Sequence, residues 1–147
     1  MLDAGHTKRL FRKIVLVKRN NMTYTSIANV GNDHSFWRKG IEFYNEEIDM
    51  MESRLEEVAK KNTTFEARQG VEHFQNQFIV QRNNSDELNH EINLYVQKLG
   101  EDAQHHAGHI GTYLVVEHDQ LQDKYENLER IMNGLRHEFK DYLAKWM

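Results

Sequence analysis

The residues best suited to chemistry are histidines and carboxylates that lie between positions 100 and 118. The chain has nine histidines, and Glu101, His105 and His109 follow one another at intervals of four residues. On a helix this spacing would place all three on one face, where imidazole and carboxylate groups could bind zinc, nickel or copper. Three glycines within 100–111 favour a solvated loop instead. We therefore predict no resident metal or other cofactor, with Glu101, His105 and His109 as the candidates should a metal bind.

The sequence gives less support to a di-iron centre or to a nucleophilic active site. A di-iron helical bundle needs inward-facing Glu-x-x-His pairs, whereas His73, His90 and His137 fall at heptad positions that face water. The chain has no cysteine, no G-x-S-x-G elbow and no glycine loop that could bind phosphate. We predict that the protein is not an enzyme and has no catalytic residues, and no small-molecule substrate is evident.

Composition points to long helices. The 147 residues include no proline, and 29% of them are charged. Without cysteine, a disulfide scaffold and a cysteine zinc site are both excluded. No apolar run approaches the 18 or so residues that a membrane-spanning helix requires. These features predict a soluble helical protein of a reducing compartment.

Heptad patterns predict three helices, over about 34–61, 64–103 and 111–146. Alternating steps of four and three residues define the buried seam of a coiled coil. The first seam is Trp37, Ile41, Tyr44, Ile48, Met51, Leu55 and Val58, and the second is Ala67, Val71, Phe74, Phe78, Gln81, Ser85, Leu88, Ile92, Tyr95 and Leu99. The third seam is Leu114, Glu117, Leu121, Lys124, Leu128, Ile131, Leu135 and Tyr142, widened by Tyr125, Met132, Phe139 and Trp146.

Short connections make the three helices antiparallel neighbours. Asn32 or Asp33 is expected to cap the first helix, and Thr63 with Glu66 has the spacing of a capping box for the second. The predicted fold class is all-α: an antiparallel up-down-up three-helix bundle with coiled-coil packing. Residues 22–147 form a single helical-bundle domain in this interpretation.

The middle of the predicted bundle is polar. Antiparallel pairing of the seams brings together Tyr44, Gln81, Ser85 and Lys124 as a polar core layer. Polar residues at seam positions cost stability but specify register, because a slipped register would leave them unpaired. The functional alternative is a polar internal site, and no convergent set of carboxylates and histidines supports it.

A second apolar row on the first helix predicts an interaction surface. Phe36, Phe43 and Met50 are spaced by sevens and point away from the main seam. On the third helix, the extra row of Tyr125, Met132, Phe139 and Trp146 has the same spacing. A wide apolar stripe is normal for a globular helix and would account for the row on the third helix. It accounts poorly for the row on the first helix, which a fourth helix or a second chain would explain, so we expect a homo-oligomer or a partner helix.

Residues 1–21 form a basic N-terminal segment with six basic residues against one acidic residue. If Met22 is the natural start, this segment is non-native. Otherwise it is a basic arm, either disordered or folded back as a short helix or strand. Binding to nucleic acid or to an anionic membrane surface is expected only if the arm is native.

Two stretches resemble a family of small uncharacterised helical proteins from Bacteroidetes. The first is Val71–Asn84 with Asp86–Leu88 and His90–Asn93, and the second is Leu135–Phe139 with Lys145–Met147. The resemblance covers about residues 22–147 and supports Met22 as the start. It implies a cytoplasmic bacterial helical protein, and it transfers no activity and no site.

Two hypotheses of function remain. The first is a non-enzymatic structural or protein-interaction module that self-associates or binds a partner helix along Phe36, Phe43 and Met50. The second is a small metal-binding or stress-protection bundle that uses the His105–His109 region.

Overall fold

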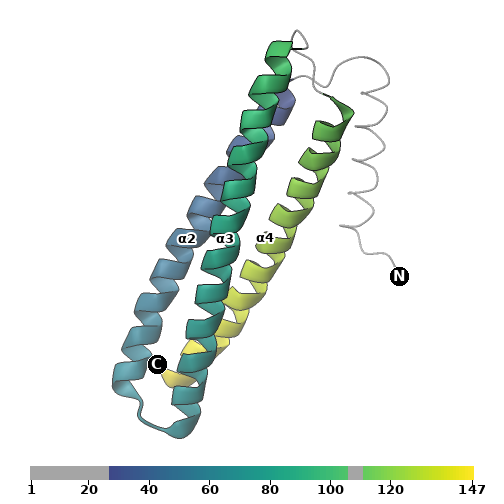
Figure 1. The fold of residues 1–147 in the computed structure, drawn as a ribbon. Helices are drawn as coiled ribbons and strands as arrows, with labels where there is room; N and C mark the ends of the chain where they lie inside the picture. The colour runs from purple at the N-terminus through teal and green to yellow at the C-terminus, as the bar shows by residue number, and fades with distance from the viewer. Residues whose placement is uncertain (1–26, 106–110) are drawn as a thin grey trace, which may run out of the picture. The chain divides into compact units, whose positions relative to one another are not determined.

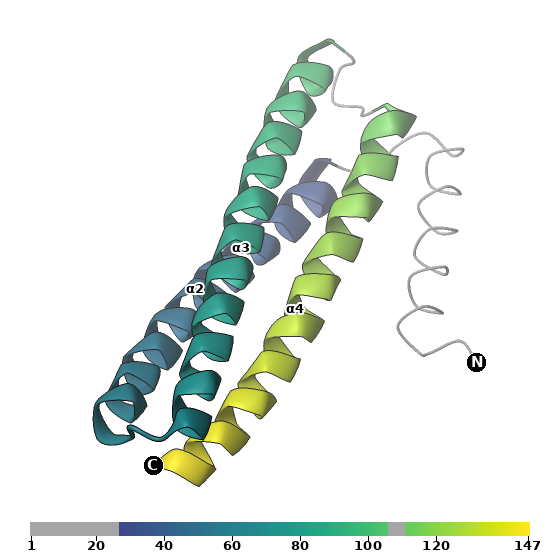
Figure 2. The ribbon, with the colours of Figure 1, turned by 60° about the horizontal axis from the view of Figure 1, so that its bottom comes forward.

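The computed structural model describes residues 27–105 and 111–147, with side chains described from residue 33 onward. Three helices occupy these residues (Figure 1): α2 (Ile27–Lys61), α3 (Phe65–His105) and α4 (Thr112–Trp146). The predicted all-α, up-down-up three-helix bundle is confirmed (Figures 1 and 2). Among these helices none is both long enough and apolar enough to span a membrane. The basic segment 1–21 lies outside the described residues.

The bounds of α3 and α4 agree with the prediction within two residues, whereas α2 begins earlier than expected. The helix starts at Ile27, seven residues before position 34, so Asn32 and Asp33 do not cap it. Residues 27–33 contain no proline and one glycine. A single glycine costs a helix only about 1 kcal/mol relative to alanine, so the helix continues through this stretch.

The described chain divides into two compact units. In unit 1 the described residues are 27–37, 90–105 and 111–125, and unit 2 consists of residues 38–89 and 126–147. Each helix contributes one segment to each unit, so each unit has its own three helical segments and its own core.

The predicted seams of α2 and α3 form the core, except that Val71 is only half-buried. Every seam position of α2 is at most 6% exposed, from Trp37 to Val58. On α3 the positions from Phe74 to Leu99 are at most 5% exposed, including the polar Gln81 and Ser85. Ile92, Tyr95 and Leu99 are therefore buried within the chain, so they give no reason to expect a covering partner.

The predicted seam of α4 is confirmed at Leu114, Leu121, Leu128 and Leu135. It is wrong at the positions between them, because the buried face of the helix is rotated toward the row that was predicted to widen the seam. Tyr125, Met132 and Phe139, predicted as a flanking row, are at most 3% exposed, whereas Lys124 lies at the surface. The observed core positions repeat in steps of four and three and include one histidine: Leu114, His118, Leu121, Tyr125, Leu128, Met132, Leu135 and Phe139. The apolar row on α4 thus belongs to the core and gives no evidence for self-association.

The turn between α2 and α3 lies in unit 2, and the residue that caps α3 there is not the predicted one. Thr64, and not Thr63, caps α3: its Oγ1 accepts from the Ala67 amide at 3.3 Å, and its carbonyl accepts from the Arg68 amide at 3.1 Å. Asn62 ends α2, and its side-chain amide donates to the carbonyls of Val58 and Trp146, each at 3.0 Å. Trp146 belongs to α4, so this turn is tied to the last turn of the third helix.

Aromatic rings fill the same end of unit 2. Phe74 and Phe78 of α3 meet Phe139 of α4 edge to face, with ring centroids 5.1 and 5.3 Å apart. Tyr142 lies 5.0 Å from Phe74, and its hydroxyl donates to the carbonyl of Ala67 at 2.7 Å. The ring of Tyr142 lies directly over Gly70, where a side chain would collide with it.

We predict opposite effects of alanine at two helical glycines of unit 2. Gly70→Ala should lower the free energy of unfolding by about 1–3 kcal/mol, because the new methyl group displaces the Tyr142 ring from its packed position. Gly134→Ala should raise it by about 0.5–1 kcal/mol, because nothing lies near its Cβ and alanine favours the helix. Urea unfolding of both variants checks this. A stabilised Gly70→Ala variant would contradict the packing of Tyr142.

Candidate functional site

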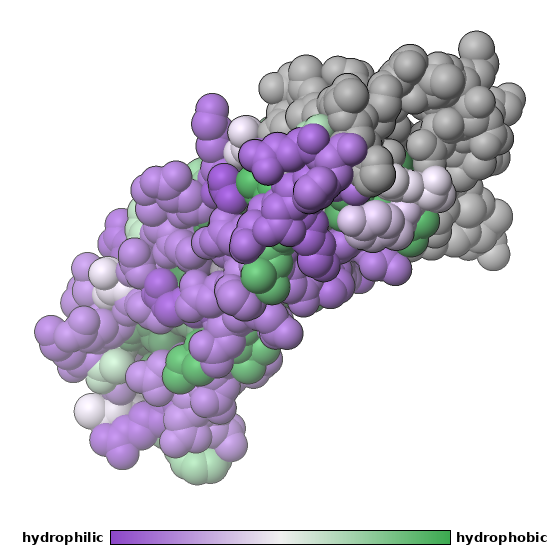
Figure 3. All heavy atoms as spheres, turned by 45° about the horizontal axis from the view of Figure 1, so that its top comes forward, coloured by the Kyte–Doolittle hydropathy of each residue, from purple (hydrophilic) through white to green (hydrophobic). Residues whose placement is uncertain are grey.

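The residues predicted as an interaction surface lie at the surface of α2. We call Phe36, Phe43 and Met50 the outer row. Their exposed fractions are 62%, 55% and 63%, which are high for large apolar side chains. Because they are seven residues apart on one helix, they lie along one face of it. On the face drawn in Figure 3, hydrophobic residues likewise reach the surface among hydrophilic ones.

Two members of the outer row are partly supported by neighbouring rings. In unit 1, Phe36 meets Tyr125 of α4 edge to face, with ring centroids 5.8 Å apart. In unit 2, Phe43 meets the ring of the buried Tyr44 at 5.5 Å. These contacts hold the rings in place while leaving more than half of each side chain exposed.

Charged groups surround Phe43 on α2. One turn away from it along the helix lie Lys39 on one side and Glu46 with Glu47 on the other. Glu47 is 9% exposed and forms a two-pronged ion pair with Arg136 of α4, at 2.9 and 2.7 Å. Lys39 and Glu46 are both exposed, and neither forms an ion pair with any residue that the structure describes.

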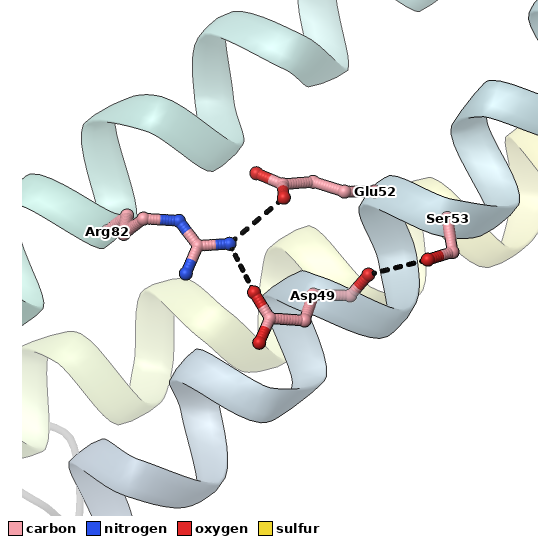
Figure 4. Close-up of polar contacts among 4 residues, drawn as sticks. All are labelled: Asp49, Glu52, Ser53 and Arg82. Atoms are coloured by element: carbon pink, nitrogen blue, oxygen red, sulfur yellow. Dashed lines mark hydrogen bonds and ion pairs between the residues drawn. The ribbon is translucent and has the colours of Figure 1, made fainter.

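The other flank of α2 in unit 2 is joined to α3 by Arg82 (Figure 4). Its Nη2 donates to Asp49 at 2.7 Å and to Glu52 at 3.0 Å. The hydrogen bond to Asp49 raises the pKa of Arg82, although partial burial opposes the shift. Because these groups are largely exposed, the network contributes little stability. It occupies the carboxylates on this side of α2.

Of the residues predicted as a polar core layer, three are buried in unit 2 and the fourth is elsewhere. Tyr44, Gln81 and Ser85 are 6%, 4% and 0% exposed. The hydroxyl of Tyr44 lies 3.4 Å from Glu129, and the side-chain oxygen of Gln81 accepts from Asn84 at 3.3 Å. Lys124 belongs to unit 1, where its ammonium group donates to Glu91 at the surface at 2.7 Å.

Unit 1 contains a buried polar cluster that sequence reasoning missed. His118 of α4 is 3% exposed, and its Nε2 lies 2.9 Å from a carboxylate oxygen of Asp33. Its ring lies 5.0 Å from Trp37 and 6.1 Å from Tyr95. The sequence signal for its burial is that position 118 completes the heptad steps between Leu114 and Leu121.

The polar groups of the other two cluster members differ in whether they have a hydrogen-bond partner. The indole of Trp37 donates to Gln122 at 2.6 Å. The hydroxyl of Tyr95 is fully buried and has no hydrogen-bond partner among the residues that the structure describes. Burial, together with the nearby charges of Glu117 and Asp33, raises the pKa of Tyr95. This hydroxyl therefore stays protonated and cannot act as a base at ordinary pH.

The candidate metal ligands are not assembled into a site within the described residues. Glu101 and His105 are exposed, and Glu101 accepts a hydrogen bond from Gln97 at 3.4 Å. His109 lies outside the described residues. Asp102, between the candidates, accepts from the amide of Gly111 at 2.8 Å and so joins the end of α3 to the start of α4. In residues 33–105 and 111–147, no three His, Asp or Glu side chains are placed to hold a metal ion.

We predict that Tyr95→Phe raises the free energy of unfolding by about 1 kcal/mol at neutral pH, because it removes a buried hydroxyl that lacks a partner. The raised pKa of Tyr95 also has a pH consequence. Above pH about 10 the unfolded chain ionises this group while the folded chain does not. Wild type should therefore lose more stability than Tyr95→Phe as the pH rises through this range.

The control for this prediction is Tyr113→Phe, which changes a tyrosine of unit 1 that is 61% exposed. Denaturant unfolding of the three proteins at neutral and alkaline pH gives the comparison. If wild type and Tyr95→Phe lose the same free energy of unfolding at alkaline pH, the hydroxyl of Tyr95 ionises freely in the folded protein.

Comparisons with models of protein families, with curated proteins and with solved structures found no match for this chain. Over residues 27–105 and 111–147 the chain is all-α with three helices, and no family is identified for it.

Proposed function

We propose that this protein is a non-enzymatic helical module that self-associates through the outer row of α2. The observation that carries the proposal is the exposure of Phe36, Phe43 and Met50, each more than half exposed on one face of one helix. Large apolar side chains in line are typical of surfaces that bind another protein.

The energetics favour burial of this row against a partner. Covering each of these side chains should contribute roughly 1–2 kcal/mol, because each is already partly buried. Part of this gain is offset by the loss of freedom on association. The remaining free energy of association suits a reversible assembly of two copies of the chain.

No nucleophile motif occurs in the sequence, and we propose no reaction, substrate or cofactor. No described cluster favours the metal-binding alternative, and we do not advance it. We extend the likeness in residues 71–93 and 135–147 to a proposal that the chain belongs with the small helical proteins of Bacteroidetes and acts in the cytoplasm.

The test of the proposed function is Phe43→Glu. The charge should abolish self-association, because a carboxylate would have to be buried in the centre of the interface. The helical content and thermal unfolding of the monomer should change little, because Phe43 is 55% exposed. Light scattering after size exclusion measures the mass of the assembly, and circular dichroism measures helicity.

The matched control is Ile79→Glu, which places the same charge on α3 at a residue that is 56% exposed. It should leave the mass of the assembly unchanged. A wild-type protein that is strictly monomeric at high concentration would refute the proposal. Unfolding of the monomer by Phe43→Glu would show instead that the residue belongs to the core.

A further inference from the structure

The charges around Phe43 distinguish the ways in which a second copy could bind. On the exposed face of α2, Lys39 lies four residues before Phe43 and Glu46 lies three residues after it. Both are exposed and have no ion-pair partner among the described residues. The neighbouring carboxylates of Glu47, Asp49 and Glu52 are already occupied by Arg136 and Arg82. One positive and one negative group thus flank the aromatic ring, nearly symmetrically.

We infer that two copies of the protein associate through antiparallel α2 helices, with a two-fold axis at Phe43. In this arrangement Phe43 packs on its counterpart, and Lys39 of each copy faces Glu46 of the other. This inference rests on the proposed self-association and specifies its partner, orientation and register.

Two other arrangements fit the same surface less well. A parallel pair in register would place Lys39 against Lys39 and Glu46 against Glu46, and like charges in such positions repel. An antiparallel pair centred on Met50 would bring Glu46 to Arg54, but it would place Phe43 against Glu57. Only the axis at Phe43 pairs apolar with apolar and opposite charge with opposite charge.

The first test uses charge reversals in the full chain. Lys39→Glu and Glu46→Lys should each raise the dissociation constant of the dimer about tenfold or more at low ionic strength, because each creates two repulsive pairs in the dimer. Mixing the two variants should restore wild-type affinity in the heterodimer, since each pair is then again of opposite sign. Sedimentation equilibrium of each variant and of the mixture measures this.

The matched control is Arg54→Glu, which reverses another exposed charge on α2. It should leave the dissociation constant unchanged. Two results together would contradict the inference. They are a weaker dimer in Arg54→Glu, and a mixture of Lys39→Glu and Glu46→Lys that binds no more tightly than either variant alone. The axis would then not lie at Phe43.

A second test is geometric and does not depend on the stability of the variants. The chain has no cysteine, so a spin label attached through Ser53→Cys marks one site per copy. With the axis at Phe43, the two labels are separated by twenty residues of helix rise, or about 30 Å along the helices. A parallel pair would hold them at about the interhelical distance of 10 Å.

The outcomes separate this inference from the proposed function. A dimer with the long label distance and rescue on mixing supports both. A dimer with the short distance, or without rescue, overturns the antiparallel arrangement and leaves self-association intact. A monomer overturns both.

Discussion

The heptad spacing of buried positions is the constraint on which the rest of the structure depends. On each helix the core residues recur in steps of four and three, which keeps one narrow face turned inward over many turns. Within each unit this regularity leaves little freedom in the rotation of a helix about its axis. The outer row of α2 is exposed for the same reason, because residues one position before Trp37, Tyr44 and Met51 must point outward.

Polar groups at core positions give this interior its specificity. Gln81 and Ser85 in unit 2 and His118 in unit 1 occupy positions that leucine would fill in an idealised bundle. The ion pair between Glu47 and Arg136 fixes how α2 lies against α4 in unit 2. Such groups contribute less to stability than apolar residues would, and they penalise alternative registers that leave them unpaired.

Most of the fold was predictable from the sequence, because α2 and α3 each contain only one plausible apolar seam. On α4 two adjacent rows competed, and the prediction assigned Glu117 and Lys124, rather than His118 and Tyr125, to the seam. An imidazole that meets a carboxylate is cheaper to bury than the ammonium group of a lysine, which is why His118 lies inside and Lys124 outside. The capping residue of α3 was ambiguous because Thr63 and Thr64 are chemically equivalent at the sequence level. The exposure of Phe43 could be predicted from its heptad position. The pairing of Glu47 with Arg136 could not, because it depends on how far α2 and α4 are shifted along each other.

The connection between the α2–α3 turn and the last turn of α4 affects how the chain is made. Residues 142–146 supply the contacts of this turn. The carbonyl of Trp146 accepts from the Asn62 side chain, and Tyr142 donates to the carbonyl of Ala67 while its ring lies over Gly70. During synthesis the hairpin of α2 and α3 emerges first, with Phe74 and Phe78 lacking the Phe139 and Tyr142 rings that later cover them. A nascent chain therefore presents these phenylalanines to solvent, or to a chaperone, until nearly all of α4 has left the ribosome.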